Sequence, residues 1–171
     1  MKKFFLFTVA LLGAITMKAQ ETDAMSATLQ NGETTTVFYG FDSFKNAVEA
    51  APDAGAMITL SPGAFSNPGD ISKSLKIYGS GFLKDGDISE TRVLGDLTIT
   101  STDEITPTVR AEGIYFTGLV IVKGTKIISN TEIIKCSFER FYNSVETNNT
   151  IIRQCYVRGN IDGQSKMASA F

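Results

Sequence analysis

The stretch Ile58-Thr59-Leu60-Ser61-Pro62-Gly63-Ala64-Phe65 decides the expected fold, because its opening apolar-polar-apolar triplet recurs further down the chain. Five more triplets follow: Leu75-Lys76-Ile77, Leu97-Thr98-Ile99, Ile114-Tyr115-Phe116, Cys136-Ser137-Phe138 and Cys155-Tyr156-Val157. Their first residues are 17, 22, 17, 22 and 19 positions apart. A repeat of about 20 residues with one short strand per repeat is typical of a solenoid, in which each coil buries its apolar face against its neighbours.

The alternation of side chains predicts which residues of each triplet face the interior. Side chains point to opposite faces along a strand, so the first and third residues are expected to point inward and the middle one outward. All the inward residues are apolar when cysteine is counted as a small buried hydrophobe. We therefore predict six strands in one register, that is, six rungs of a parallel solenoid. An antiparallel sandwich is the alternative, but Asn31-Gly32 and Asp85-Gly86 do not separate two strong adjacent strands as hairpin turns would.

Residues 34–55 are predicted to cover the first coil. Thr34–Tyr39 is β-branched and aromatic, which favours a strand, and Asp42 or Ser43 can begin a short helix that ends before Pro52. The end of a parallel stack exposes unpaired backbone groups, so a cover with one apolar face is expected there. We divide the chain into a signal peptide (1–19), a flexible leader (20–33), an N-terminal cap (34–55), a parallel β-helix (56–163) and a tail (164–171).

The N-terminus has the pattern of a secretory signal peptide. Met1-Lys2-Lys3 supplies basic residues, an apolar run covers 4–17, and Ala19 is a small residue suited to a cleavage point. The run is shorter than the ~20 residues of a membrane-spanning helix, and no later stretch is long enough to span a bilayer. We expect cleavage after Ala19 and export, which places the mature chain in the periplasm, at the cell surface or outside the cell.

The cap and the first coils also resemble a known superfamily. The stretches that carry the resemblance are Ala50-Ala51-Pro52-Asp53-Ala54-Gly55, then 58–65, then Ile71-Ser72-Lys73-Ser74-Leu75-Lys76-Ile77-Tyr78-Gly79. They resemble the start of pectate-lyase-like right-handed parallel β-helix proteins, over about residues 42–160. The resemblance implies an all-β fold, a right-handed parallel β-helix of about six rungs with a short strand-helix cap. It implies no single activity, because the superfamily includes lyases, glycoside hydrolases, esterases and adhesins.

Composition argues against several kinds of chemistry. The chain has no histidine and no tryptophan, so it lacks an imidazole for base catalysis or metal binding and an indole for stacking on a sugar. Without residues 1–19 it carries 13 basic and 18 acidic side chains, which disfavours nucleic acid as a partner. The resemblance implies grouped acidic residues for lyase or hydrolase activity, yet the outward rows contain almost none. We predict no catalytic residue, no metal site and no cofactor.

Cys136 and Cys155 occupy the same inward position of neighbouring triplets. In an exported protein they are close enough for a disulfide by distance. Parallel strands, however, place the two Cβ vectors side by side, which is a poor approach for a disulfide. The sequence is therefore consistent with either two buried thiols or one disulfide. A zinc site is not expected, because two cysteines without further ligands are too few to bind zinc.

The candidate binding site lies on the last two expected rungs. Lys135, Glu139 and Arg140 belong to one rung, and Tyr156 and Arg158 belong to the next. The simpler interpretation is a surface ion pair between Glu139 and Arg158, with Tyr156 covering apolar area. The sharper hypothesis is a site for a sugar or uronate, in which tyrosine supplies a stacking face and arginine binds the carboxylate.

Three functions are consistent with this sequence. The first, which we favour, is an exported, non-catalytic β-helix module that binds glycan or another cell-surface component. The second is the N-terminal part of a longer polysaccharide lyase or glycoside hydrolase whose active site lies beyond residue 171. The third is a structural module that self-associates through an uncapped C-terminal end, since 164–171 is short and weakly apolar.

Overall fold

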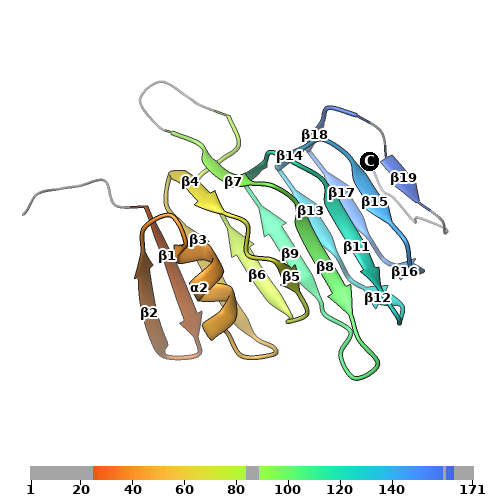
Figure 1. Ribbon diagram of the computed structural model, residues 1–171, viewed down its shortest axis with the longest axis horizontal. Coiled ribbons are helices and arrows are strands. Elements are labelled where there is room, and N and C mark those ends of the chain that lie inside the picture. The colour runs from red at the N-terminus through yellow and green to blue at the C-terminus, as the bar shows by residue number, and fades with distance from the viewer. Residues whose placement is uncertain (1–24, 84–88, 160, 164–171) are drawn as a thin grey trace, which may run out of the picture.

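Short β-branched and aromatic segments separated by tight turns favour coils that are built from several small strands. The computed structural model describes residues 25–83, 89–159 and 161–163. These residues form a β-solenoid of stacked parallel coils with one short helix at the N-terminal end (Figure 1). The expected signal peptide (1–19) and tail (164–171) lie outside the described residues. Within the described part of the chain, no helix has the length and apolar character needed to cross a membrane.

Three parallel sheets run along the coils, and each coil contributes one strand to each sheet. Sheet A contains, in parallel, β3 (Ala56–Leu60), β6 (Leu75–Tyr78), β9 (Val109–Glu112), β13 (Glu132–Ile134) and β17 (Ile151–Arg153). Sheet B contains β4 (Gly63–Ser66), β7 (Thr91–Leu94), β10 (Tyr115–Phe116), β14 (Ser137–Phe138) and β18 (Tyr156–Val157). Sheet C contains β5 (Asp70–Ile71), β8 (Leu97–Ser101), β11 (Val120–Gly124), β15 (Phe141–Asn143) and β19 (Ile161–Gly163). A further pair joins β12 (Ile128–Ser129) and β16 (Thr147–Asn148).

The predicted fold class is confirmed and the count of about six rungs is slightly too high, whereas the predicted common register of the six triplets is wrong. From β3 in the first coil to β17 in the fifth, the solenoid makes about four turns. The triplets at Ile58 and Leu75 lie in sheet A, the triplet at Leu97 lies in sheet C, and the last three end in sheet B. The reason is that every strand of a coil has the same apolar-polar alternation. A spacing of 17 to 22 residues can therefore lead from one face of the solenoid to the next as well as once around it.

The interior of the coils is apolar, as the alternation predicts. The first and third residues of the first five triplets are all buried, with exposed fractions of 2% or less. One interior column of sheet B consists of Phe65, Val93, Phe116, Phe138 and Val157. Burial of each phenylalanine side chain contributes roughly 1.5–3 kcal/mol to the stability of the fold. Apolar columns of this kind therefore stabilise the stacking of successive coils.

The predicted strand-helix cap covers the first coil. Strand β2 (Thr34–Tyr39) is followed by helix α2 (Ser43–Ala50), which buries Phe44 against the strands of the first coil. The helix begins after Asp42, whose side chain makes no capping hydrogen bond. At the other helix end the Lys73 ammonium donates hydrogen bonds to three backbone carbonyls of 48–51, at 2.6 to 3.0 Å. A cation there satisfies carbonyl groups that have no partner within the helix.

Part of the expected flexible leader (20–33) is instead a strand of sheet A. Strand β1 (Ser26–Asn31) pairs antiparallel with β3 on one side and with β2 on the other. Ala27 and Leu29 alternate with polar residues and are both buried. Gly32, with φ of 57°, begins the two-residue turn that joins β1 to β2. A short alternating strand next to a hairpin turn is thus ordered by pairing, although its sequence is mostly polar.

Candidate functional site

The corner between sheets A and B differs between coils in its length. In four coils this corner has two residues, at 61–62, 113–114, 135–136 and 154–155. In the second coil it extends over residues 79–90, of which 79–83 and 89–90 are described. Insertions in solenoid repeats form loops on one face, which is often the binding face. The corner of the second coil is therefore the place to look for a site.

Three of the four two-residue corners place their first residue in the left-handed backbone region. Gly113 (φ 73°), Lys135 (φ 48°) and Gln154 (φ 56°) occupy this position in three successive coils. Glycine adopts this conformation without a steric penalty, whereas for a residue with a Cβ the conformation costs roughly 1–2 kcal/mol of folding stability. Lys135 thus projects its side chain from a corner whose backbone would favour glycine.

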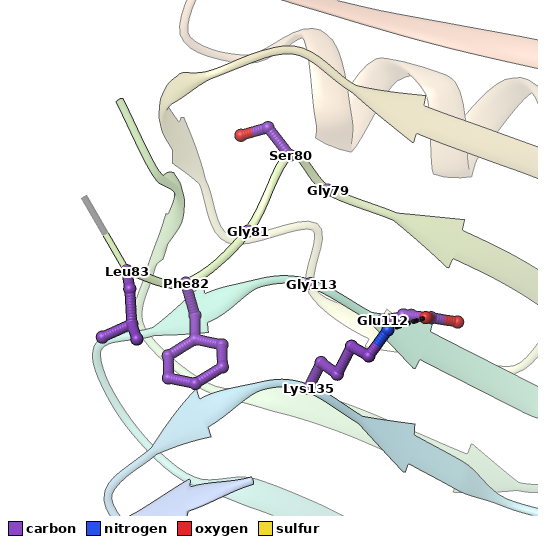
Figure 2. Close-up of a pocket in the computed structure, with 8 residues that line it drawn as sticks. All are labelled: Gly79, Ser80, Gly81, Phe82, Leu83, Glu112, Gly113 and Lys135. Carbon is purple, nitrogen blue, oxygen red and sulfur yellow. Dashed lines mark ion pairs between the residues drawn. The ribbon is translucent and has the colours of Figure 1, made fainter. Parts of the chain in front are cut away.

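A pocket of about 370 Å³ lies at this corner (Figure 2). Its lining consists of Gly79, Ser80, Gly81, Phe82, Leu83, Glu112, Gly113 and Lys135. Backbone forms its floor, where the Gly81 N–H donates to the Gly113 carbonyl at 2.9 Å. A Cβ on Gly79 would lie against this same carbonyl and 2.8 Å from Ile114 Cγ1. The pocket therefore depends on close backbone packing that only glycine allows.

Two kinds of side chain face each other across the pocket. Figure 2 shows Phe82 and Leu83 on one side and the Glu112–Lys135 pair on the other. Lys135 Nζ lies 3.8 Å from Glu112 Oε1, and the Lys135 side chain is 58% exposed. The pocket thus combines an apolar wall that includes one aromatic ring with one carboxylate and one accessible ammonium group.

Glu112 is held in its ionised form by a neighbouring network on the outer face of sheet A. Arg110 donates one hydrogen bond to Glu112 and another to Glu132, both at 2.6 Å. The hydrogen bond from Arg110 lowers the pKa of Glu112, and the same bond raises the pKa of Arg110. An ionised carboxylate only accepts hydrogen bonds. Because a general base works best with a pKa near the working pH, the lowered pKa suits Glu112 to ligand binding better than to proton transfer.

The structure distributes the predicted site residues over two places. Lys135 lines the corner pocket, whereas Tyr156 lies on the outer face of sheet B with 62% of its surface exposed. Glu139 and Arg140 follow β14 and are exposed. The five residues expected to form one cluster are therefore not brought together around a single cavity.

Arg158 has a different environment from the expected one. Its guanidinium lies 4.9 Å from the centre of the Tyr115 ring and donates to the Thr117 carbonyl at 2.9 Å. The Arg92 guanidinium lies 5.0 Å from the same ring. Within the described residues, no ion pair joins Arg158 to Glu139, so the expected surface pair is not formed. Arg158 instead ties the fifth coil to the third.

Both cysteines are free thiols. The Cys136 thiol donates to the Ile134 carbonyl at 3.2 Å, and the Cys155 thiol donates to the Ile133 carbonyl at 3.3 Å. Burial raises the pKa of Cys136 to about 12, so this thiol stays protonated and unreactive. Across the described ranges, no group of three or more Cys, Asp or Glu side chains is placed to hold a metal ion.

Sequence reasoning missed Phe82, Glu112 and the glycines of the pocket floor. The available signal was the long interval between the strands at Leu75 and Thr91, which marks an insertion, together with the Gly79-Ser80-Gly81 turn at its start. No family model, curated protein or solved structure matches the chain. The fold and the geometry of the corner are therefore the basis for a functional argument.

Proposed function

We propose that the chain is an exported, non-catalytic parallel β-helix module that binds glycan at a cell surface. The stacked parallel coils support a place among pectate-lyase-like proteins at the level of architecture. The observation that carries the proposal is the corner pocket, because it lies beside the one A–B corner in the described coils that is longer than two residues.

The pocket has the chemistry of a sugar site. Its volume of about 370 Å³ is at the lower end of the roughly 300–1,000 Å³ typical of small-molecule sites. The Phe82 ring offers an apolar surface to the C–H face of a pyranose. Ionised Glu112 accepts hydrogen bonds from hydroxyl groups, and Lys135 donates to them or pairs with a carboxylate. One sugar unit bearing a carboxylate fits these groups better than a purely apolar ligand.

A longer chain has a path beyond the pocket. Lys135 is two residues from Ser137, which pairs in register with the exposed Tyr156. A glycan that places one unit in the pocket therefore passes towards sheet B, where Tyr156 supplies a second stacking surface. This arrangement keeps Lys135 and Tyr156 in the binding role expected of them and assigns Arg158 mainly to packing.

Binding is tested by affinity electrophoresis in gels that contain alginate, an acidic polysaccharide, or dextran, a neutral one. We expect slower migration in alginate and not in dextran. Lys135→Gly removes the ammonium group while suiting the left-handed backbone, so the variant should stay folded and lose the retardation. Gln154→Gly makes the same backbone change one coil later, outside the pocket lining, and should be retarded like the unmodified chain.

Three results would contradict the proposal. Equal migration of the unmodified chain in alginate, dextran and plain gels would show that it binds neither the acidic nor the neutral polysaccharide. Retardation in dextran alone would contradict the acidic specificity. Retardation that survives Lys135→Gly would place the binding surface elsewhere.

A further inference from the structure

The edge strand β2 lacks the features that usually protect a sheet edge. Among the strands that the structure describes, sheet A has the order β17-β13-β9-β6-β3-β1-β2, so β2 has a described neighbour on one side only (Figure 1). Its sequence, Thr-Thr-Thr-Val-Phe-Tyr, contains no charge, no proline and no glycine. Edge strands are normally blunted by charged residues, proline, bulges or a covering segment, because their free backbone groups can pair with another strand.

The pairing of β2 with β1 defines which backbone groups point outward. Asn31 and Thr34 close a two-residue turn, so this pair is hydrogen-bonded, and hydrogen-bonded pairs alternate along an antiparallel ladder. The Gly40 N–H donates to the Met25 carbonyl at 2.7 Å, which agrees with this alternation. It follows that the even-numbered residues of β2 bond to β1. The N–H and C=O groups of Thr35, Val37 and Tyr39 therefore point to the free edge.

The side chains of these three residues share the outer face of sheet A. Phe38, on the opposite face, packs against the core. Val37 is 42% exposed and Tyr39 is 69% exposed. An exposed row of apolar and β-branched side chains thus coincides with an exposed row of backbone donors and acceptors.

We infer that β2 pairs antiparallel with β2 of a second copy of this chain, around a twofold axis that passes through Val37. Thr35 of one copy then lies opposite Tyr39 of the other, and the two Val37 residues lie opposite each other. In this register every hydrogen-bonded pair joins residues whose backbone groups point to the free edge. The register also keeps the outer face of both sheets on the same side. The three hydrogen-bonded pairs contribute about six backbone hydrogen bonds.

A second copy fits this edge better than a charged strand. In a twofold arrangement every side chain of β2 meets a residue of the same strand, and a charge beside the axis would lie near its own copy and repel it. The six residues of β2 carry no charge. Contact along one short strand buries less area than the roughly 1,600 Å² of a standard interface, so the dimer should be weak and depend on concentration.

The dimer is tested by sedimentation of the purified full chain between about 1 µM and 1 mM, the range in which weak interfaces associate. We expect a shift from monomer to dimer across this range. Hydrogen exchange followed by NMR at the two ends of the range gives an independent measurement. The amides of Thr35, Val37 and Tyr39 should gain protection in the dimer, whereas those of Thr36 and Phe38 are already bonded to β1 and should change little.

Val37→Lys should raise the dissociation constant at least about tenfold, because it sets two positive charges opposite each other and removes an apolar contact. Thr59→Lys is the matched control, since Thr59 is exposed on the interior strand β3 of the same sheet and has no part in the edge. A chain that stays monomeric up to about 1 mM, a dimer that tolerates Val37→Lys, or an equal loss in Thr59→Lys would each overturn the inference. Protection that rises equally at odd and even positions of β2 would overturn it as well.

Discussion

The A–B corner of the second coil and that of the fifth coil join the same two sheets but differ in what they contain. In the fifth coil, Gln154 and Cys155 make the turn with one left-handed residue. In the second coil, residues 79–90 separate the strands, and a pocket lined by Phe82, Glu112 and Lys135 lies beside them. Because two residues satisfy the fold, the additional residues of the second coil are not explained by the fold. This difference is the reason that the proposed binding site is placed at the second-coil corner and not at the fifth.

The largest expected effect is a loss of folding stability when the close backbone packing at the second-coil corner is disturbed. Gly79→Ala should lower the free energy of unfolding by about 3 kcal/mol, because its Cβ would meet the Gly113 carbonyl, Ile114 and Thr91. Gly55→Ala is the comparison, since φ there is 87° but no atom lies within 4 Å of the added Cβ. It should lose only about 1 kcal/mol. Urea denaturation measures both, and equal losses would show that the close packing at Gly79 is not a constraint.

The next effect concerns ligand binding at the two places that carry predicted site residues. Phe82→Ala should weaken alginate binding about tenfold, or ~1.4 kcal/mol, because the pocket loses its aromatic wall. Tyr156→Ala should weaken it only about twofold, because this ring lies outside the pocket. Titration calorimetry with alginate oligosaccharides measures both changes. A larger effect of Tyr156→Ala would move the main contact from the corner to sheet B.

A smaller effect concerns the acid dependence of stability. Arg110 lowers the pKa of Glu112 in the folded chain, so the stability that Glu112 contributes is present above the ordinary glutamate pKa and is lost as the pH falls through the lowered value. Glu112→Gln removes this contribution. Between about pH 7 and about pH 3 the variant should therefore lose less stability than the unmodified chain, by a difference of less than about 1 kcal/mol. An equal or greater loss in the variant would contradict the role of the Arg110 hydrogen bond.

The smallest expected effect is the change in folding stability when Lys135, whose ammonium group is proposed to bind the ligand, is replaced. Lys135→Gly should leave the free energy of unfolding unchanged or raise it by about 0.5 kcal/mol, because relief of the left-handed backbone outweighs the entropy that glycine adds to the unfolded chain. Gln154→Gly should behave alike, since its φ of 56° is similar. Thermal unfolding of both variants is the measurement. A marked loss in Lys135→Gly alone would mean that its pair with Glu112 stabilises the corner.

The apolar-polar-apolar triplets were sufficient to predict stacked parallel coils and their interior residues. They were not sufficient for the register, because Ile58 and Leu97 look alike in sequence yet lie in different sheets. Chain order within a coil, and not local pattern, decides which face a strand joins. Asn31-Gly32 does mark a hairpin turn, but β1 before it is too polar for its sequence to indicate a strand. Its stability comes from pairing with β2 and β3, which no local pattern records.

The candidate site was predictable only in part. Lys135 was identified from its place among polar outward residues, but Glu112 and Phe82 are distant from it in sequence and meet it through coil stacking. Arg158 looked available for a ligand, yet it reaches back to Tyr115, a contact between the fifth and third coils. Contacts of this kind depend on side-chain length and on the small Ser137 between the two strands.

The most direct test of the glycan-binding account is an NMR titration of the chain with alginate oligosaccharides, in which every backbone amide reports on its own surroundings. The account predicts shifts at Gly81, Phe82, Glu112 and Lys135, and little change at Gln154 in the equivalent corner of the fifth coil. Shifts that are absent at the second-coil corner, or that are as large at Gln154 as at Lys135, would contradict it.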